Sequence, residues 1–283
     1  MPAPVITRFA PSPTGLLHLG HAYAAKVARD LAKAQGGQFL LRFEDIDHTR
    51  VRPEYYAGIE EDLHWLGLDW DGPALRQSAR ADAYAAALTR LQEIGAVYPC
   101  FCTRREIEEE IARMVSAPHG PEGALYPGIC RRISLEEGAQ RLTAGDQPAW
   151  RLDASKAIEM AGELTFTDLR HGRIRVDPGL LGDVVLARKD IGTSYHLAVV
   201  VDDAFQGVTH ITRGEDLLPS THVHRVLQTL LGLPEPQYLH HHLITDNQGV
   251  RLAKRADAMA IRRFRECGRD AKDVLEDLNP VDP

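Results

Sequence analysis

The apolar positions of the first 70 residues follow two patterns in turn. Short apolar runs of strand length occupy residues 4–10 and 39–43. A stretch with apolar side chains at helical spacing follows each run, from residue 18 to 35 and from Pro53 onward, and glycines follow both stretches. Strand, helix, strand, helix in this order predicts an α/β fold with a parallel sheet, whose ligands bind at the carboxyl ends of the strands.

The pattern is less regular in the middle of the chain. Loops rich in proline and glycine interrupt residues 98–182, and we interpret this stretch as an insertion between two halves of the sheet domain, residues 1–97 and 183–244. Within the second half a helix is predicted over residues 216–232. The last stretch, residues 245–283, is basic and is predicted to be helical.

Composition and charge exclude some classes of protein. The chain of 283 residues has 44% hydrophobic residues, as globular proteins do, and its net charge of -7 argues against broad adhesion to nucleic acid. Residues 251–272 are locally basic, with eight Lys/Arg and three Asp/Glu. The N-terminus has no secretory signal pattern and no apolar run approaches the ~20 residues of a membrane span, so we expect a cytoplasmic protein that does not contact membranes.

Three of the four cysteines cluster. Cys100, Cys102 and Cys130 lie within the insertion, whereas Cys267 stands apart. In a cytoplasmic chain such clustering favours a metal over a disulfide, and three thiolates suit zinc, which takes four tetrahedral ligands. We therefore predict one structural Zn²⁺ per chain; three reduced cysteines without a metal are the alternative.

The stretch from Arg8 to His21 carries most of the chemistry, because here a predicted strand passes into a helix. A helix N-terminus offers free backbone N–H groups and a partial positive charge, which suit a triphosphate. Gly20 allows a nucleotide to approach the backbone, and His18 and His21 are placed to donate hydrogen bonds to phosphate oxygens. Two histidines at this spacing alone are more often surface or capping residues, so the interpretation depends on the whole stretch.

That stretch, RFAPSPTGLLHLGH, resembles the signature of class I aminoacyl-tRNA synthetases, in particular of their glutamyl and glutaminyl branch. Further matches follow in the order of the family: LRFEDID at 41–47, WLGLDWD at 65–71, QS at 77–78, VVDD at 200–203 and ITRGED at 211–216. The resemblance covers nearly the whole chain. It implies a Rossmann-like parallel sheet of the class I synthetase type, with a zinc-containing insertion and a short helical C-terminal segment. It also implies that ATP, with Mg²⁺, is a substrate.

The second signature of the family, close to KLSKR, corresponds here to RLAKR at residues 251–255. The resemblance places Lys254 on the lysine that neutralises the triphosphate, and Arg251 at the same ATP site. Arginine at position 251 keeps a positive charge with a different geometry, and Ala253 lacks the hydroxyl of the family's serine. These departures concern the rate of activation; a catalytically inactive loop is the alternative.

The resemblance also implies the amino acid. A pocket selective for glutamate needs cations for the carboxylates and an anion for the ammonium. Arg8 and Arg213 correspond to carboxylate-binding arginines and Glu44 to the residue that contacts the ammonium, while Ser12 and Tyr195 line the same pocket. A structural ion pair is the alternative for each residue taken singly. The set together favours glutamate over glutamine or another acid.

One branch of the family, the glutamyl-queuosine branch, has the same C-x-C…Y-x-x-x-C arrangement and uses the tyrosine oxygen as the fourth zinc ligand. We therefore expect Tyr126 to complete the cysteine site, with His119 as the alternative. The three histidines at 240–242 lie on a predicted strand, where they point to alternate faces, and are interpreted as structural.

The same branch lacks the anticodon-binding domain of ordinary glutamyl-tRNA synthetases, and this chain stops about where that domain begins. By resemblance the branch activates glutamate without tRNA and attaches it to queuosine at the wobble position of tRNA(Asp). We expect a monomer that binds L-glutamate, ATP and the queuosine-containing anticodon loop of tRNA(Asp), with the basic segment after Arg251 contacting phosphates. Two alternatives stay open: a truncated enzyme that charges a tRNA 3′ end, and a non-enzymatic paralogue that binds RNA or the adenylate.

Overall fold

The computed structural model describes residues 4–113, 119–120, 123–180, 182–244 and 260–278. Its first half repeats the predicted strand–helix unit: β1 (Ile6–Phe9), α1 (Leu19–Ala34), β2 (Gln38–Phe43), α2 (Pro53–Trp65) and β3 (Leu75–Arg76). The three strands pair in parallel in the order β1-β2-β3. Helix α1 packs against β1 and β2 through a face that is rich in buried alanines, so the helix lies close to the sheet.

Local sequence explains where these helices begin and end. Pro53 starts α2 because its ring presets the helical φ and its missing N–H would be unpaired there anyway. Gly36 and Gly67 follow α1 and α2 with φ of 63° and 68°, a left-handed conformation that glycine adopts without strain. The predicted starts and stops of both helices are confirmed to within a few residues.

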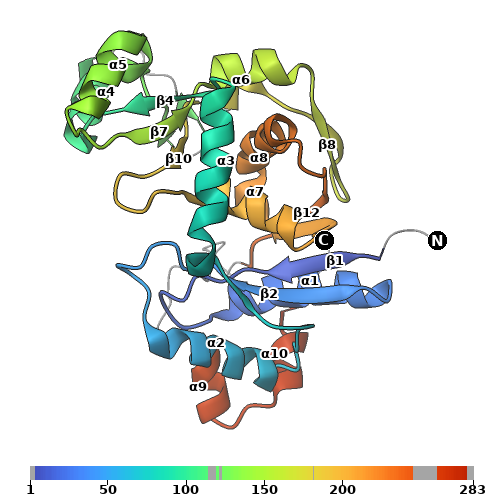
Figure 1. The fold of residues 1–283 in the computed structure, drawn as a ribbon. Helices are drawn as coiled ribbons and strands as arrows, with labels where there is room; N and C mark the ends of the chain where they lie inside the picture. The colour runs from blue at the N-terminus through green and yellow to red at the C-terminus, as the bar shows by residue number, and fades with distance from the viewer. Residues whose placement is uncertain (1–3, 114–118, 121–122, 181, 245–259, 279–283) are drawn as a thin grey trace.

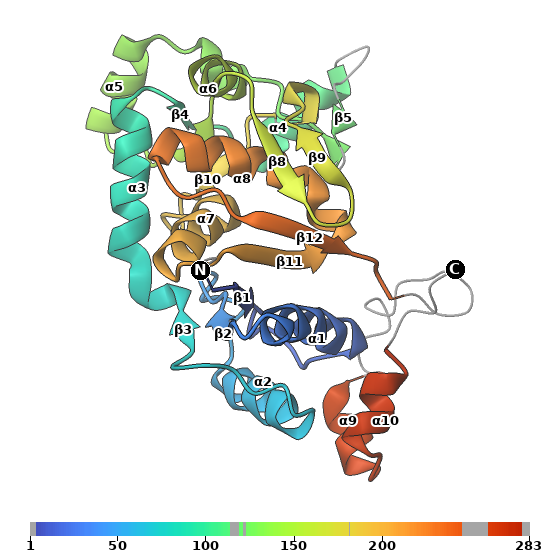
Figure 2. The same ribbon diagram turned by 90° about the vertical axis from the view of Figure 1, so that its right-hand side faces the viewer.

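A sheet in the order β11-β12-β8-β9 joins the second half to the end of the middle stretch. Strand β12 (Gln237–His241) pairs in parallel with β11 (His210–Gly214) on one side and with β8 (Thr165–Asp168) on the other. Strand β9 (Gly172–Arg175) forms an antiparallel hairpin with β8. Helices α7 (Tyr195–Phe205) and α8 (Leu218–Leu231) pack against each other, and α8 confirms the helix predicted over 216–232. The Thr209 N–H donates to the Ile6 carbonyl at 3.0 Å, so β11 runs beside β1 and joins the two halves (Figures 1 and 2).

The middle of the chain is more regular than its sequence pattern indicated. An antiparallel sheet joins β4 (Val97–Cys100), β7 (Ala149–Leu152) and β10 (Val185–Ala187). The helices α4 (Arg104–Arg113) and α5 (Leu135–Thr143) lie at the outer end of this sheet in Figure 1. The remaining short elements are β5 (His119–Gly120), β6 (Gly123–Ala124), α6 (Ala154–Ala161) and the 3₁₀ turns Ile129–Arg132 and Pro178–Leu180. Strand pairing crosses residue 182, the predicted end of the insertion. Strand β10, which follows this residue, pairs with β7, and β8, which precedes it, pairs with β12.

Two further segments connect the parts. Helix α3 (Ala81–Glu93) runs along one side of the molecule from β3 toward the middle segment (Figure 2). After the gap at 245–259 the chain returns to α1: the Ile261 N–H donates to the Leu17 carbonyl at 2.8 Å, and Ala260 pairs with His18. Helices α9 (Ile261–Glu266) and α10 (Ala271–Glu276) then lie beside α2. None of the helices in the described ranges is long and apolar enough to cross a membrane.

Candidate active site

A cavity of about 420 Å³ lies between the two halves, near the carboxyl ends of β1 and β11. Four of the predicted substrate residues line it, together with one of the signature histidines: Arg8, Glu44, Tyr195, Arg213 and His21. They come from two strands, two helices and, for Glu44, the residue that follows β2, and they belong to both halves, so the site forms only when the halves are joined. The position agrees with the expectation that ligands bind at the carboxyl ends of parallel strands.

The two signature histidines cap helix α1 with their Nδ1 atoms. His18 Nδ1 accepts the N–H of Gly20 at 3.1 Å, and His21 Nδ1 accepts the N–H of His18 at 3.3 Å. Burial lowers the pKa of both imidazoles, that of His21 to about 3, so both are neutral at physiological pH. A neutral imidazole that accepts at Nδ1 carries its proton on Nε2. Capping therefore leaves each ring with an Nε2–H donor for a ligand at the helix N-terminus.

Gly20 has a steric role in this cap. A Cβ atom at position 20 would stand 3.1 Å from His18 Cε1 and 3.2 Å from His18 Nδ1, closer than side chains normally pack. The stacked His18 and His21 rings, with centroids 3.7 Å apart, leave His18 little room to yield. The glycine therefore keeps the histidine pair in place, in addition to the close nucleotide approach that the sequence indicated.

Arg213 is a buried cation supported by neutral groups. Its guanidinium donates to Tyr195 Oη at 3.3 Å, to His224 Nδ1 at 3.1 Å, and to the hydroxyl of Thr221. Within the described ranges, no carboxylate lies within ion-pair distance of it. Buried charges are normally paired, so an arginine of this kind in a cavity wall favours an anionic ligand.

A second set of contacts orients the Arg213 guanidinium through its Nε atom. Its Nε–H donates to His240 Nε2 at 3.3 Å, and His240 Nδ1 lies 2.7 Å from an Asp168 carboxylate oxygen. Although burial raises the pKa of Asp168, donors that include the His171 N–H and His240 lower it to about 2, so the carboxylate is ionised. His240 therefore connects the Arg213 guanidinium to the Asp168 carboxylate through two hydrogen bonds, and the carboxylate itself does not contact Arg213. The interpretation of 240–242 as structural agrees with the burial of His240, but His240 also supports the site.

Arg8 is placed differently from Arg213, because it already has a carboxylate partner. Its Nε and Nη2 atoms face Asp203 at 2.8 and 3.3 Å, and its Nη1 atom donates to the Thr212 carbonyl at 3.2 Å. Arg42, which is fully buried, donates to the same aspartate at 2.7 Å. Burial raises the pKa of Asp203, but the two arginines outweigh that effect and hold it below its ordinary value. A guanidinium has five N–H donors, so Arg8 retains donors toward the cavity.

Glu44 is the anion of the cavity. Its carboxylate lies 3.5 Å from Arg42 Nη2 and its side chain is 16% exposed. Burial raises the pKa of Glu44 above its ordinary value, against the opposing effects of Arg42 and Arg8. An acceptor-only carboxylate at this point suits an ammonium group.

Ser12 lines a neighbouring cavity of about 320 Å³, which shares Glu44 and Tyr195 with the first. The structure therefore places Ser12 in a cavity that adjoins the first one, and not among the residues that line the first. The two remaining predicted ATP-site residues, Arg251 and Lys254, lie outside the described residues, as does Ala253.

The cysteine cluster forms as predicted. The three Sγ atoms of Cys100, Cys102 and Cys130 lie within 4.8 Å of one another, and the Tyr126 hydroxyl lies 3.4 Å from Sγ of Cys100 and of Cys102. Zn–S bonds of about 2.3 Å place sulfur atoms about 3.8 Å apart, and Cys102 and Cys130 Sγ lie 3.3 Å apart. With a small outward shift, the three thiolates and the Tyr126 oxygen could hold a tetrahedral Zn²⁺. The backbone of His119 belongs to β5, and its side chain lies outside what the structure describes.

The family of the chain follows from a comparison of its sequence. The family described as class I tRNA synthetases (E and Q), catalytic domain, matches residues 4–277. The chain belongs to this family.

Its relatives carry two kinds of name. A Glutamyl-Q tRNA(Asp) synthetase of Rhodobacter capsulatus is 50% identical and covers 95% of this chain and 98% of its own, and one of Nocardia farcinica is 47% identical over 95% and 81%. A glutamate tRNA ligase of Elizabethkingia meningosepticum, solved in complex with its amino acid, has a TM-score of 0.77 at 30% identity. The match covers 90% of this chain and 53% of that one, so the chain spans about half of that ligase.

Family membership confirms the predicted fold and the assignment as a synthetase-type ligase. The sequence interpretation missed two residues of the site, Arg42 and Asp203, which join β2, β1 and α7 through one buried ion cluster. A signal for Arg42 was available: an arginine inside the apolar run 39–43 must be buried and therefore needs an anion. The C-terminal basic segment is partly engaged within the protein, since Arg265 pairs with Glu61 and Arg269 with Asp277.

Proposed function

We propose that the protein activates L-glutamate with ATP as glutamyl adenylate, without tRNA, and transfers the glutamyl group to queuosine at the wobble position of tRNA(Asp). The observation that carries the amino acid is Arg213, a buried cation with neutral neighbours in the wall of the cavity. The names of the Rhodobacter and Nocardia relatives support the acceptor.

In this proposal the glutamate side-chain carboxylate binds Arg213, its ammonium binds Glu44, and Tyr195 and Ser12 add hydroxyls. The remaining N–H donors of Arg8 face the α-carboxylate. One α-carboxylate oxygen bonds to the α-phosphorus of ATP, the bond to the bridging oxygen breaks, and pyrophosphate leaves. The Nε2–H groups of His18 and His21 and the ammonium of Lys254 stabilise the developing phosphate charge, and Mg²⁺ accompanies ATP.

In the second step an acceptor hydroxyl oxygen bonds to the carbonyl carbon of the adenylate. The bond between that carbon and the AMP oxygen breaks, and the hydroxyl proton passes to the departing phosphate. No covalent intermediate with the protein is required. Cys100, Cys102, Cys130 and Tyr126 would hold a structural Zn²⁺, which would stabilise the β4 end of the middle segment when bound.

Labelled glutamate, ATP and Mg²⁺ test the proposal with two tRNA pools, one from queuosine-replete and one from queuosine-deficient cells. Label that depends on the replete pool and stays in the anticodon fragment after nuclease cleavage is the expected result. Equal label at the 3′ end of both pools would replace the proposal with a truncated charging enzyme. Absence of label together with absence of glutamate-dependent pyrophosphate exchange would indicate a binding paralogue.

A further inference from the structure

The second cavity adjoins the first through Glu44 and Tyr195, which line both. Arg213 lines only the first cavity, so a group bound in the second would approach glutamate past Glu44 and Tyr195. The cavity's volume of about 320 Å³ lies at the lower end of the range for small-molecule sites. An acceptor must enter next to the activated carboxyl group, and a cavity that adjoins the amino-acid pocket meets this requirement.

Ser194, in the wall of this cavity, has a buried hydroxyl without a hydrogen-bond partner among the described residues. The residue is 8% exposed. It stands at the N-cap of α7, a position where serine usually caps the helix with its hydroxyl, but here it makes no such bond. A buried hydroxyl without a partner is costly and requires an explanation, which a group bound in the cavity would supply.

Asp47 complements Ser194 on the same cavity wall. Its carboxylate accepts from Thr49 Oγ1 at 2.6 Å and lies 3.3 Å from Arg188, which leaves acceptor positions free. Arg50, exposed at the same cavity, has no ion-pair partner in the described ranges, so its charge is available for a phosphate.

We infer that the second cavity binds the vicinal diol of the acceptor nucleoside, with Ser194 Oγ and the Asp47 carboxylate as its hydrogen-bond partners. This inference rests on the proposed function. Each hydroxyl of a diol both donates and accepts, which suits one serine hydroxyl and one carboxylate. The cyclopentene ring of queuosine carries such a diol, and so does the ribose at a tRNA 3′ end, so the two sources share one chemistry.

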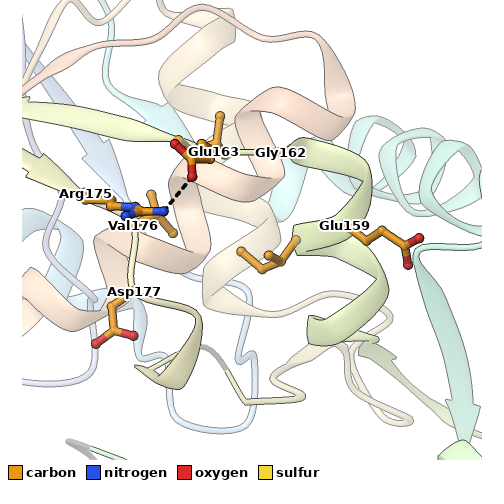
Figure 3. Close-up of a pocket in the computed structure, with 8 residues that line it drawn as sticks. Glu159, Gly162, Glu163, Arg175, Val176 and Asp177 are labelled. Atoms are coloured by element: carbon orange, nitrogen blue, oxygen red, sulfur yellow. Dashed lines mark hydrogen bonds and ion pairs between the residues drawn. The ribbon is translucent and has the colours of Figure 1, made fainter.

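Another hollow lacks these features. It has a volume of about 500 Å³ and lies beside α6 and β9 (Figure 3). Its polar side chains are satisfied or solvated: Arg175 pairs with Glu163 at 2.7 Å, and Glu159 points away from that pair. None of its lining residues, all within the described ranges, holds a buried polar atom without a partner. It therefore gives no comparable indication of a ligand.

The substitution Ser194→Ala tests the inference, and Thr193→Val is its matched control. Thr193 is 3% exposed and its Oγ1 atom also lacks a partner among the described residues, but it does not line the cavity. The measured quantity is kcat/KM for queuosine-containing tRNA, divided by the rate of glutamate-dependent pyrophosphate exchange. We expect this ratio to fall about tenfold in Ser194→Ala and to stay within about twofold of wild type in Thr193→Val.

An unchanged ratio in Ser194→Ala would overturn the inference, as would an equal loss in both variants. If the wild-type protein labels the 3′ end, the proposed function fails, but the same ratio measured with that terminal ribose still tests the diol site. If the wild-type protein labels neither the anticodon fragment nor the 3′ end, the affinity for free queuosine nucleoside is measured instead. Equal affinity in wild type and Ser194→Ala contradicts the inference.

Discussion

Arg213 Nε lies 3.3 Å from Nε2 of His240, so a neutral imidazole, and not a carboxylate, supports this buried guanidinium. Burial, together with Arg213 itself, lowers the pKa of His240 to about 4, and its Nδ1 proton is directed to Asp168. The ring therefore remains an acceptor at neutral pH. The positive charge of Arg213 is oriented but not neutralised, which is the property a carboxylate-selective pocket needs.

Replacing this cation should impair glutamate binding more than folding. In Arg213→Gln we expect the KM for glutamate in pyrophosphate exchange to rise at least a hundredfold, because a charge-assisted pair worth about 3 kcal/mol is lost. The melting temperature should hold or rise, because an unpaired buried charge is removed. Arg213→Lys keeps the charge without the fork and should lie between the two proteins. A KM close to that of wild type in Arg213→Gln would remove Arg213 from the glutamate site.

A methyl group at position 20 should disturb catalysis through His18. Gly20→Ala places a Cβ atom 3.1 Å from the His18 ring, so the imidazole must shift away from its capping position. We expect kcat for pyrophosphate exchange to fall by a factor on the order of 100, with little change in the KM for glutamate. Gly15→Ala is the control within the same signature, because no atom lies within 4 Å of a Cβ there. Equal effects of both substitutions would contradict a specific role for the cap.

The fourth ligand of the cysteine site can be identified by metal affinity. Tyr126→Phe removes the hydroxyl that lies 3.4 Å from two thiols, so we expect zinc affinity to fall tenfold or more and the melting temperature to fall with it. His119→Ala should leave both unchanged. Competition with a chromophoric chelator and elemental analysis measure the two variants. The opposite ranking would make His119 the ligand.

Asp62 should make stability depend on pH. Its carboxylate is fully buried, neither oxygen has a hydrogen-bond partner in the described ranges, and burial raises its pKa to about 6 against the opposing effects of Arg265 and Arg262. Between pH 4 and 6 the folded protein holds a proton that the unfolded chain has released, so raising the pH through this window costs stability.

The measurement is the difference in unfolding free energy between Asp62→Asn and wild type across that window. We expect the unfolding free energy of Asp62→Asn to rise relative to that of wild type by about 2–3 kcal/mol between pH 4 and pH 7. Glu61→Gln removes an exposed carboxylate from the same Arg265 and is the control. A difference that does not vary with pH would show that Asp62 is ionised throughout.

Local patterns predicted the elements on which the proposed nucleotide site lies. The helix from residue 18 begins where the sequence placed it because His18 is its N-cap, and α2 begins at Pro53 for an equally local reason. The cysteine cluster was predictable for a related reason: two of its members are two residues apart, and thiols have few other roles in such a chain.

Long-range pairing could not be predicted in the same way. Arg8 and Asp203 are 195 residues apart, and only the junction of β1 with β11 brings them together. The sequence indicated a cation at Arg8 without revealing that its anion is already supplied by the protein. Ser194 gave no signal at all, because an unpaired hydroxyl is a property of its surroundings and not of its neighbours in sequence.

The ammonium of Lys189 donates to the carbonyls of Phe101 and Cys102, at 3.0 and 3.4 Å. Lys189 immediately follows Arg188, which lines the second cavity, so the turn that carries two of the thiols and the loop that leads to Ser194 are tied together. Two ligands that order tied segments share a coupling free energy, and such coupling is reciprocal. A metal ion that orders the thiol turn would then strengthen binding in the second cavity, and a ligand bound there would raise the affinity for the ion by the same factor.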